Sequence, residues 1–166
     1  MDQAQGAIDA ARAAGAEQFA KEEFTASVDS LRRSEEAVTQ RDYRLALSLA
    51  IDGRSRAQNA AKLAGEARAK LRGDAERAVG EVEALLKHAR ERLADQTVTA
   101  LPRRALQDAR TTIASVEKSM QEARAALKSE DYRRTMERTK GLVARVQAAL
   151  TSIDDALAAG RPRRTR

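Results

Sequence analysis

The chain has 166 residues, no cysteine and a formal net charge of +6, a size that suits one domain or two small units sharing a core. The lack of cysteine excludes disulfides and thiolate metal sites, and no stretch approaches the roughly 20 apolar residues that span a bilayer. Leu, Ile, Val and Phe supply only 29 residues, yet they recur at helical spacing, so the composition indicates a folded, alanine-rich helical protein rather than a disordered chain.

Part of the positive charge is concentrated at the carboxyl end. Four of the 31 basic residues lie in the last six positions, so the first 160 residues carry 27 basic and 25 acidic groups. Domains that bind polyanions usually spread basic charge along one face, and this near-neutral body argues against nucleic acid. We expect residues 160–166 to form a basic, disordered tail, with weak binding to anionic lipid or cell-wall polymer as the functional alternative. The tail arginines are Arg161, Arg163, Arg164 and Arg166.

The first half of the chain predicts two long helices. A short alanine-rich helix bends near Gly15, an amphipathic helix follows to about Gln40, and a longer helix runs from Asp42 to Ala94 unless Gly73 ends it. Apolar residues at three- and four-residue steps predict the sides that face the core. These positions are Phe24, Val28, Leu31, Val38, Leu45, Leu49, Ala57, Ala60, Ala64, Leu71, Val79, Val82, Leu86, Ala89 and Leu93.

The second half predicts an antiparallel hairpin. A break is expected in the segment DQTVTALPRR, residues 95–104, because β-branched residues precede Pro102, and proline favours the first turn of a helix. Two heptad stripes follow with a short turn between them, and such stripes fold back on each other. The stripes are Leu106, Ala109, Ile113, Val116, Met120, Ala123 and Leu127, then Thr139, Val143, Val146, Leu150, Ile153 and Leu157.

The only two tyrosines lie in matching segments, QRDYR at 40–44 and SEDYR at 129–133. Asp42 and Asp131 are predicted to cap the helix that returns from each hairpin turn. Tyr43 and Tyr132 are then predicted to cover the hairpin ends with their rings. Because the motifs lie 89 residues apart and other apolar positions match at that offset, we interpret the chain as two copies of one helical hairpin.

The predicted fold is therefore all-α. It consists of elongated antiparallel helical hairpins in a coiled-coil-like bundle, with two weakly similar hairpins joined by a long helix. In this division, residues 1–95 form the N-terminal hairpin with its long connecting helix, and residues 102–159 form the C-terminal hairpin.

The first copy resembles an alanine-rich bacterial family of unknown function over about residues 4–75. The shared features are an alanine-glycine-alanine step, the Asp42–Tyr43 turn and alanines at heptad spacing, while Arg41 stands where the family usually has glycine. Because its members are commonly small lipoproteins or exported proteins, the resemblance implies a periplasmic or outer-membrane-associated protein whose export signal is absent from this sequence. A cytoplasmic location is the alternative. The matching residues are Ala14, Gly15, Ala16, Ala46, Ala50, Ala57, Ala60 and Ala64.

No pattern of side chains predicts catalysis, a metal site or a cofactor. His88 is the only histidine, so it lacks the partners that a zinc site needs and is expected at an exposed helix position. Carboxylates are expected in ion pairs one helical turn apart, such as those of Arg72 with Glu76, Arg77 with Glu81 and Glu83 with Lys87. The protein is predicted not to be an enzyme.

The predicted function is that of a structural or adaptor protein of the bacterial envelope, acting through helix–helix contacts with a protein partner or with itself. Ala57, Ala60 and Ala64 are the candidate docking face, since small residues let helices approach closely. The alternative is that they pack within the chain against residues 1–40. A cytosolic, nucleic-acid-associated helical protein is the alternative function, which the excess of arginine over lysine favours.

Overall fold

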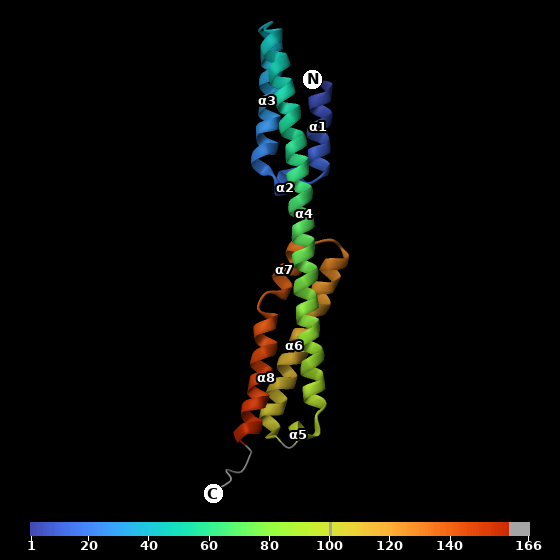
Figure 1. Ribbon diagram of the computed structural model, residues 1–166, viewed down its shortest axis with the longest axis vertical. Coiled ribbons are helices and arrows are strands. Elements are labelled where there is room, and N and C mark those ends of the chain that lie inside the picture. Colours follow the sequence, from blue (N-terminus) through green and yellow to red (C-terminus); the bar gives the residue numbers. More distant parts are fainter. Residues whose placement is uncertain (100, 160–166) are drawn as a thin grey trace. The chain divides into compact units, whose positions relative to one another are not determined.

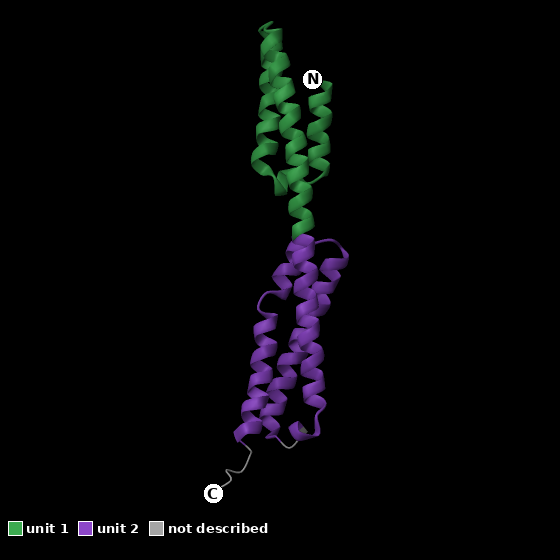
Figure 2. Ribbon diagram, in the orientation of Figure 1, with its two compact units in different colours: residues 1–70 green, residues 71–166 purple. Residues whose placement is uncertain are grey.

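The computed structural model describes residues 1–99 and 101–159 of the chain, so the predicted basic tail lies outside the described residues. Every regular element in these ranges is a helix (Figure 1), which confirms the predicted all-α class. The chain divides into two compact units, unit 1 with residues 1–70 and unit 2 with residues 71–166 (Figure 2).

Unit 1 consists of three packed helices and one short helix. Gly15 ends the first helix with a φ of +83°, a left-handed conformation that glycine adopts without steric cost, and this confirms the predicted bend. The elements are α1 (Asp2–Ala13), α2 (Ala16–Phe19), α3 (Lys21–Thr39) and the first part of α4 (Tyr43–Ala94).

The helices α3 and α4 meet along a seam of small residues. Gly53 lies so close to α3 that a Cβ atom added there would be 3.2 Å from the carbonyl oxygen of Ser27. The hydroxyl of Ser34 donates a hydrogen bond of 2.7 Å to the carbonyl oxygen of Ala46, and it is buried. A buried hydroxyl needs such a partner, so the serines of α3 stabilise the close approach.

This seam makes several of the predicted core positions wrong. Leu45 is 45% exposed, and Val28 and Val38 are also exposed. Because the backbones of α3 and α4 come so close, only small side chains fit between them. Ala46 and Gly53 therefore occupy the buried face of α4, and the larger side chains lie on its flanks.

Unit 2 has a core of larger side chains. α6 packs against both α7 and α8, which confirms the predicted antiparallel hairpin. The elements of unit 2 are the remainder of α4, α5 (Gln96–Thr99), α6 (Arg103–Lys128), α7 (Tyr132–Thr139) and α8 (Leu142–Ala159). Its main core cluster contains Val79, Val82, Leu86, Ala89, Ile113, Val116, Met120, Ala123, Leu142 and Val146.

Two features of unit 2 differ from the prediction. Residues 71–94 belong to unit 2 rather than to the N-terminal hairpin, because Val82 and Leu86 pack in one cluster with residues of α6 and α8. The sequence leaves open whether this helix ends at Gly73, and α4 continues through that residue without a break. The returning helix, predicted as one run, is instead divided at Gly141, whose φ of +76° separates α7 from α8.

The α3–α4 and α6–α7 turns have the same backbone geometry. Arg41 and Glu130 adopt φ values of 62° and 59°. The next residue in each turn, Asp42 or Asp131, donates its N–H over 2.9 Å to the carbonyl oxygen five residues earlier, as in a Schellman motif. Each aspartate carboxylate also accepts a 3.0 Å bond from the N–H three residues later. The predicted helix caps are confirmed.

The order of elements also repeats. Each unit has a helix, a four-residue helix, a long helix, the turn just described and a returning helix; α2 and α5 are the four-residue members. α4 provides the returning helix of unit 1 and the first helix of unit 2. The internal duplication inferred from the tyrosine motifs is therefore matched in the backbone.

Replacement of Arg41 by glycine should stabilise unit 1. A non-glycine residue in the left-handed region costs about 1–2 kcal/mol, and part of the gain is offset by the larger unfolded-state entropy of glycine. We expect Arg41→Gly to raise the free energy of unfolding by about 0.5–1 kcal/mol in urea titrations followed by circular dichroism. The matched control Arg33→Gly, in the interior of α3, should lower it by about 1 kcal/mol. An equal loss of unfolding free energy in the two variants would contradict the left-handed conformation of Arg41 in this turn.

Two glycine-to-alanine variants test the close approach of α3 and α4. Gly65 has open space where a Cβ would be placed, so Gly65→Ala should gain about 1 kcal/mol from helix propensity. Gly53→Ala should be less stable than Gly65→Ala, because its methyl group would press on the α3 backbone. Equal stabilities in chemical denaturation would mean that the seam is looser than described.

Candidate protein-interaction surface

The predicted docking alanines are not available to a partner. Ala57, Ala60 and Ala64 have no exposed surface and lie in the core of unit 1 with side chains of α1 and α3. The docking hypothesis for this face is therefore wrong, and the alternative of packing within the chain is correct. The reason is that α1 covers a face whose small side chains permit close contact. The other members of the cluster are Ala4, Ile8, Ala11, Ala16, Phe24 and Leu31.

The two corner tyrosines, predicted to be equivalent, have different surroundings. Tyr132 is only 8% exposed, as expected for a ring that covers a hairpin end, but Tyr43 is 66% exposed. In unit 1 the α3–α4 turn extends beyond the N-terminal end of α1 (Figure 1), so the third helix does not reach Tyr43. In unit 2 the pKa of Arg72 of α4 is raised chiefly by its hydrogen bond to Glu76 and further by the nearby Tyr132. The covering role is wrong for Tyr43.

Tyr43 begins an uncovered apolar stripe on α4. Leu47 and Ile51 follow at intervals of four residues, with 64% and 60% of their surface exposed. Residues four apart lie on one side of a helix, so the three side chains form one row, which we call the α4 stripe. They are the three most exposed large apolar side chains in the part of the chain that the structure describes.

A groove of about 330 Å³ lies beside the α4 stripe. Leu47, Ile51 and Arg54 form its α4 side, and the first residues of α1, Met1–Ala4, form the other. The Arg54 guanidinium donates a 2.7 Å hydrogen bond to the side-chain oxygen of Gln3. This bond connects the first turn of α1 to α4 beside the groove.

Two arginines beside the α4 stripe have no acidic partner. Arg44 is one turn from Leu47 on the same side of α4, and Arg54 lines the groove. Neither guanidinium forms an ion pair with any carboxylate of residues 1–99 or 101–159. By contrast, Arg56 is paired with Asp52 at 2.9 Å. The surface around the stripe therefore offers positive charge that the chain itself does not neutralise.

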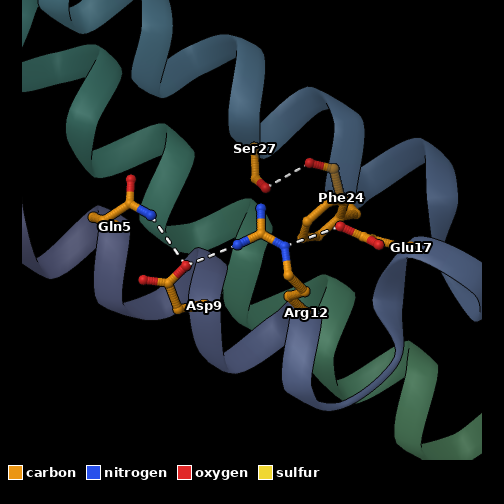
Figure 3. A network of polar contacts seen from close by, with 6 residues as sticks. All are labelled: Gln5, Asp9, Arg12, Glu17, Phe24 and Ser27. Carbon is orange, nitrogen blue, oxygen red and sulfur yellow. Dashed lines mark hydrogen bonds and ion pairs between the residues drawn. The ribbon is translucent and has the colours of Figure 1, made fainter.

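A cluster of polar contacts joins α1, α2 and α3 (Figure 3). The Arg12 guanidinium contacts Asp9 at 3.0 Å and Glu17 at 2.9 Å, and it lies over the ring of Phe24, 5.6 Å from the ring centre. Gln5 donates a 3.1 Å bond to the same Asp9 carboxylate. Each charged group has a partner of opposite sign, so the cluster has a structural role, in which Arg12 connects α1 to α2 and α3.

Two carboxyl groups have lowered pKa values. The hydrogen bond from the Ser30 hydroxyl, followed by the one from Arg56, lowers the pKa of Asp52. The backbone N–H of Thr97, followed by its hydroxyl, lowers the pKa of Asp95, which precedes α5. In both cases the bonds stabilise the ionised form, as expected of structural contacts.

Some ion pairs of unit 2 differ from those that the sequence predicted. Arg72 pairs with Glu76 as expected, but Arg77 pairs with Asp74 and Glu83 pairs with Arg124 of α6 at 2.7 Å. Local spacing cannot anticipate a partner on another helix. His88 is exposed, as predicted, and no group of metal-binding side chains occurs in the described ranges.

Comparisons with protein-family models, with curated proteins and with solved structures found no match to the chain. None of the helices in the described ranges has the length and apolar character needed to cross a bilayer.

The sequence analysis missed the exposed residues Leu47 and Ile51, because it placed the apolar row of this helix at Leu45 and Leu49 instead. The signal that could have found them is their spacing of four and eight residues from Tyr43.

Introduction of charge at the buried alanines should unfold unit 1. Ala60→Glu and Ala64→Glu each place a carboxylate where the side chain has no exposed surface, at a cost of about 3 kcal/mol or more. We expect loss of helical circular dichroism and rapid proteolysis within residues 1–70. Ala69→Glu is the matched control, because Ala69 is exposed on the same helix. A folded Ala60→Glu protein would reinstate these alanines as a docking face.

Proposed function

We propose that this protein is a non-enzymatic adaptor of the bacterial cell envelope that acts through helix–helix contacts with other proteins. The observation that supports this function is the α4 stripe, where Tyr43, Leu47 and Ile51 are each at least 60% exposed. Solvent exposure of neighbouring large apolar side chains is typical of interaction sites. The envelope location rests on the resemblance of residues 4–75 to a family of lipoproteins and exported proteins.

The arrangement of charge favours this function over nucleic-acid binding. Arginines that would hold phosphate groups must be available to do so, whereas one set of the described arginines pairs with carboxylates of their own unit. These arginines are Arg12, Arg32, Arg56, Arg72, Arg77, Arg90, Arg92, Arg124 and Arg138. A protein partner is therefore the better-supported ligand.

Fractionation of cells that produce the full gene product tests the envelope location. Site-specific crosslinking tests the binding of other proteins. A photoreactive amino acid at Tyr43 in unit 1, or at the exposed Gln107 in unit 2, should form crosslinks to another protein in the envelope fraction. Mass spectrometry of the mature N-terminus should show processing or lipid modification.

The matched control places the photoreactive amino acid at Leu63, an exposed position of α4 outside the stripe, from which fewer crosslinks to another protein are expected than from Tyr43. An unprocessed protein in the cytosol would contradict the envelope location. Crosslinks that go to nucleic acid instead of protein would contradict the adaptor function and support the alternative.

A further inference from the structure

The α4 stripe continues the surface on which α1 is seated. α1 covers α4 from the point where Arg54 bonds to Gln3, and further along Ala57 and Ala64 pack in one cluster with Ile8 of α1. Toward Tyr43 the same helix has no cover from α1. The uncovered row from residue 43 to residue 51 extends over about 12 Å at 1.5 Å per residue, which is enough for two turns of another helix.

The charges around the α4 stripe indicate what kind of helix could bind there. Arg44 and Arg54 flank the row without carboxylate partners in the described part of the chain. The one carboxylate that lines the groove is Asp2, in the first turn of α1, where the helix dipole stabilises it. A helix with acidic side chains beside its apolar row would pair with both arginines.

We propose that the α4 stripe and its groove bind an acidic amphipathic helix of a protein partner, placed beside the first residues of α1. The partner helix has apolar residues at three- and four-residue intervals, so that they contact Leu47 and Ile51, and Asp or Glu at the flanking positions. This inference rests on the proposed adaptor function and specifies its partner.

Two other occupants fit the surface less well. A second copy of this chain in a two-fold contact would present the same surface to itself, and so would add another Arg44 and Arg54 rather than the missing carboxylates. A membrane surface requires a broad apolar face, whereas the α4 stripe is one residue wide and lies beside a groove.

Synthetic helices provide the direct test. The probe is a capped, fluorescent peptide longer than about 15 residues, so that it forms a stable helix, with an alanine and leucine row flanked by glutamate. A second peptide has lysine in place of glutamate. In fluorescence anisotropy with the full chain, we expect the glutamate peptide to bind at least about ten-fold more tightly, because only it can pair with the arginines.

Variants then locate the binding site. Leu47→Ala with Ile51→Ala should weaken binding of the glutamate peptide about ten-fold, and alanine preserves the helix. The matched control Leu63→Ala, at another exposed position of α4, should change the affinity less than about two-fold, because surface contacts outside a binding site contribute little. Arg44→Glu should reverse the preference toward the lysine peptide. Equal affinity for the two peptides, or no effect of the double variant, would overturn the proposal.

Two further outcomes would also overturn it. Binding to vesicles of phosphatidylglycerol that is lost in the Leu47→Ala, Ile51→Ala variant, without peptide binding, would assign the surface to lipid. A dimer in sedimentation velocity that the same variant dissociates would assign it to a second copy of the chain.

Crosslinking in cells separates failure of this inference from failure of the adaptor function. A photoreactive group at Leu47 should capture a protein segment that mass spectrometry identifies as acidic and amphipathic. Protein crosslinks from Gln107 but none from Leu47 would overturn the proposed surface and leave the adaptor function intact. No protein crosslink from either position would overturn both.

Discussion

The close contact between α3 and α4 is the constraint on which the structure of unit 1 depends. Because Gly53 lies against the α3 backbone, the facing positions must be small, and serine hydroxyls on α3 are satisfied by hydrogen bonds such as that of Ser34 to Ala46. The larger residues of α4 cannot enter this seam. They lie on the flanks, where α1 covers one part of the helix and leaves Leu47 and Ile51 exposed.

The two units show how the same turn can have two roles. Both turns place a non-glycine residue in the left-handed region and use an aspartate cap. In unit 2 the tyrosine that follows is buried, whereas Tyr43 in unit 1 is exposed. The difference arises from the third helix, because α1 begins too far from the α3–α4 turn to cover it. A motif that occurs twice in the sequence therefore has a buried tyrosine in one unit and an exposed tyrosine in the other.

The packing of the two units also differs in kind. Unit 1 relies on alanine and glycine, which permit close backbones but bury little apolar area for each residue. Unit 2 buries valine, leucine, isoleucine and methionine, and ion pairs such as Arg124 with Glu83 connect its helices. Exposed ion pairs stabilise a fold only slightly, so most of the stability of unit 2 comes from its larger core.

The sequence by itself determined the helical class, the two hairpin turns and their aspartate caps, because helical periodicity and capping depend on residues within a few positions of each other. It also identified the heptad stripes of α6 and α8, where large apolar residues mark the buried side. Tertiary structure decided which face of α4 is buried, that residues 71–94 belong to unit 2, and that Tyr43 is exposed while Ala57, Ala60 and Ala64 are not. Alanine fits both a core and a surface, so its pattern does not reveal which helix covers it, and the exposed surface follows from where α1 begins on α4.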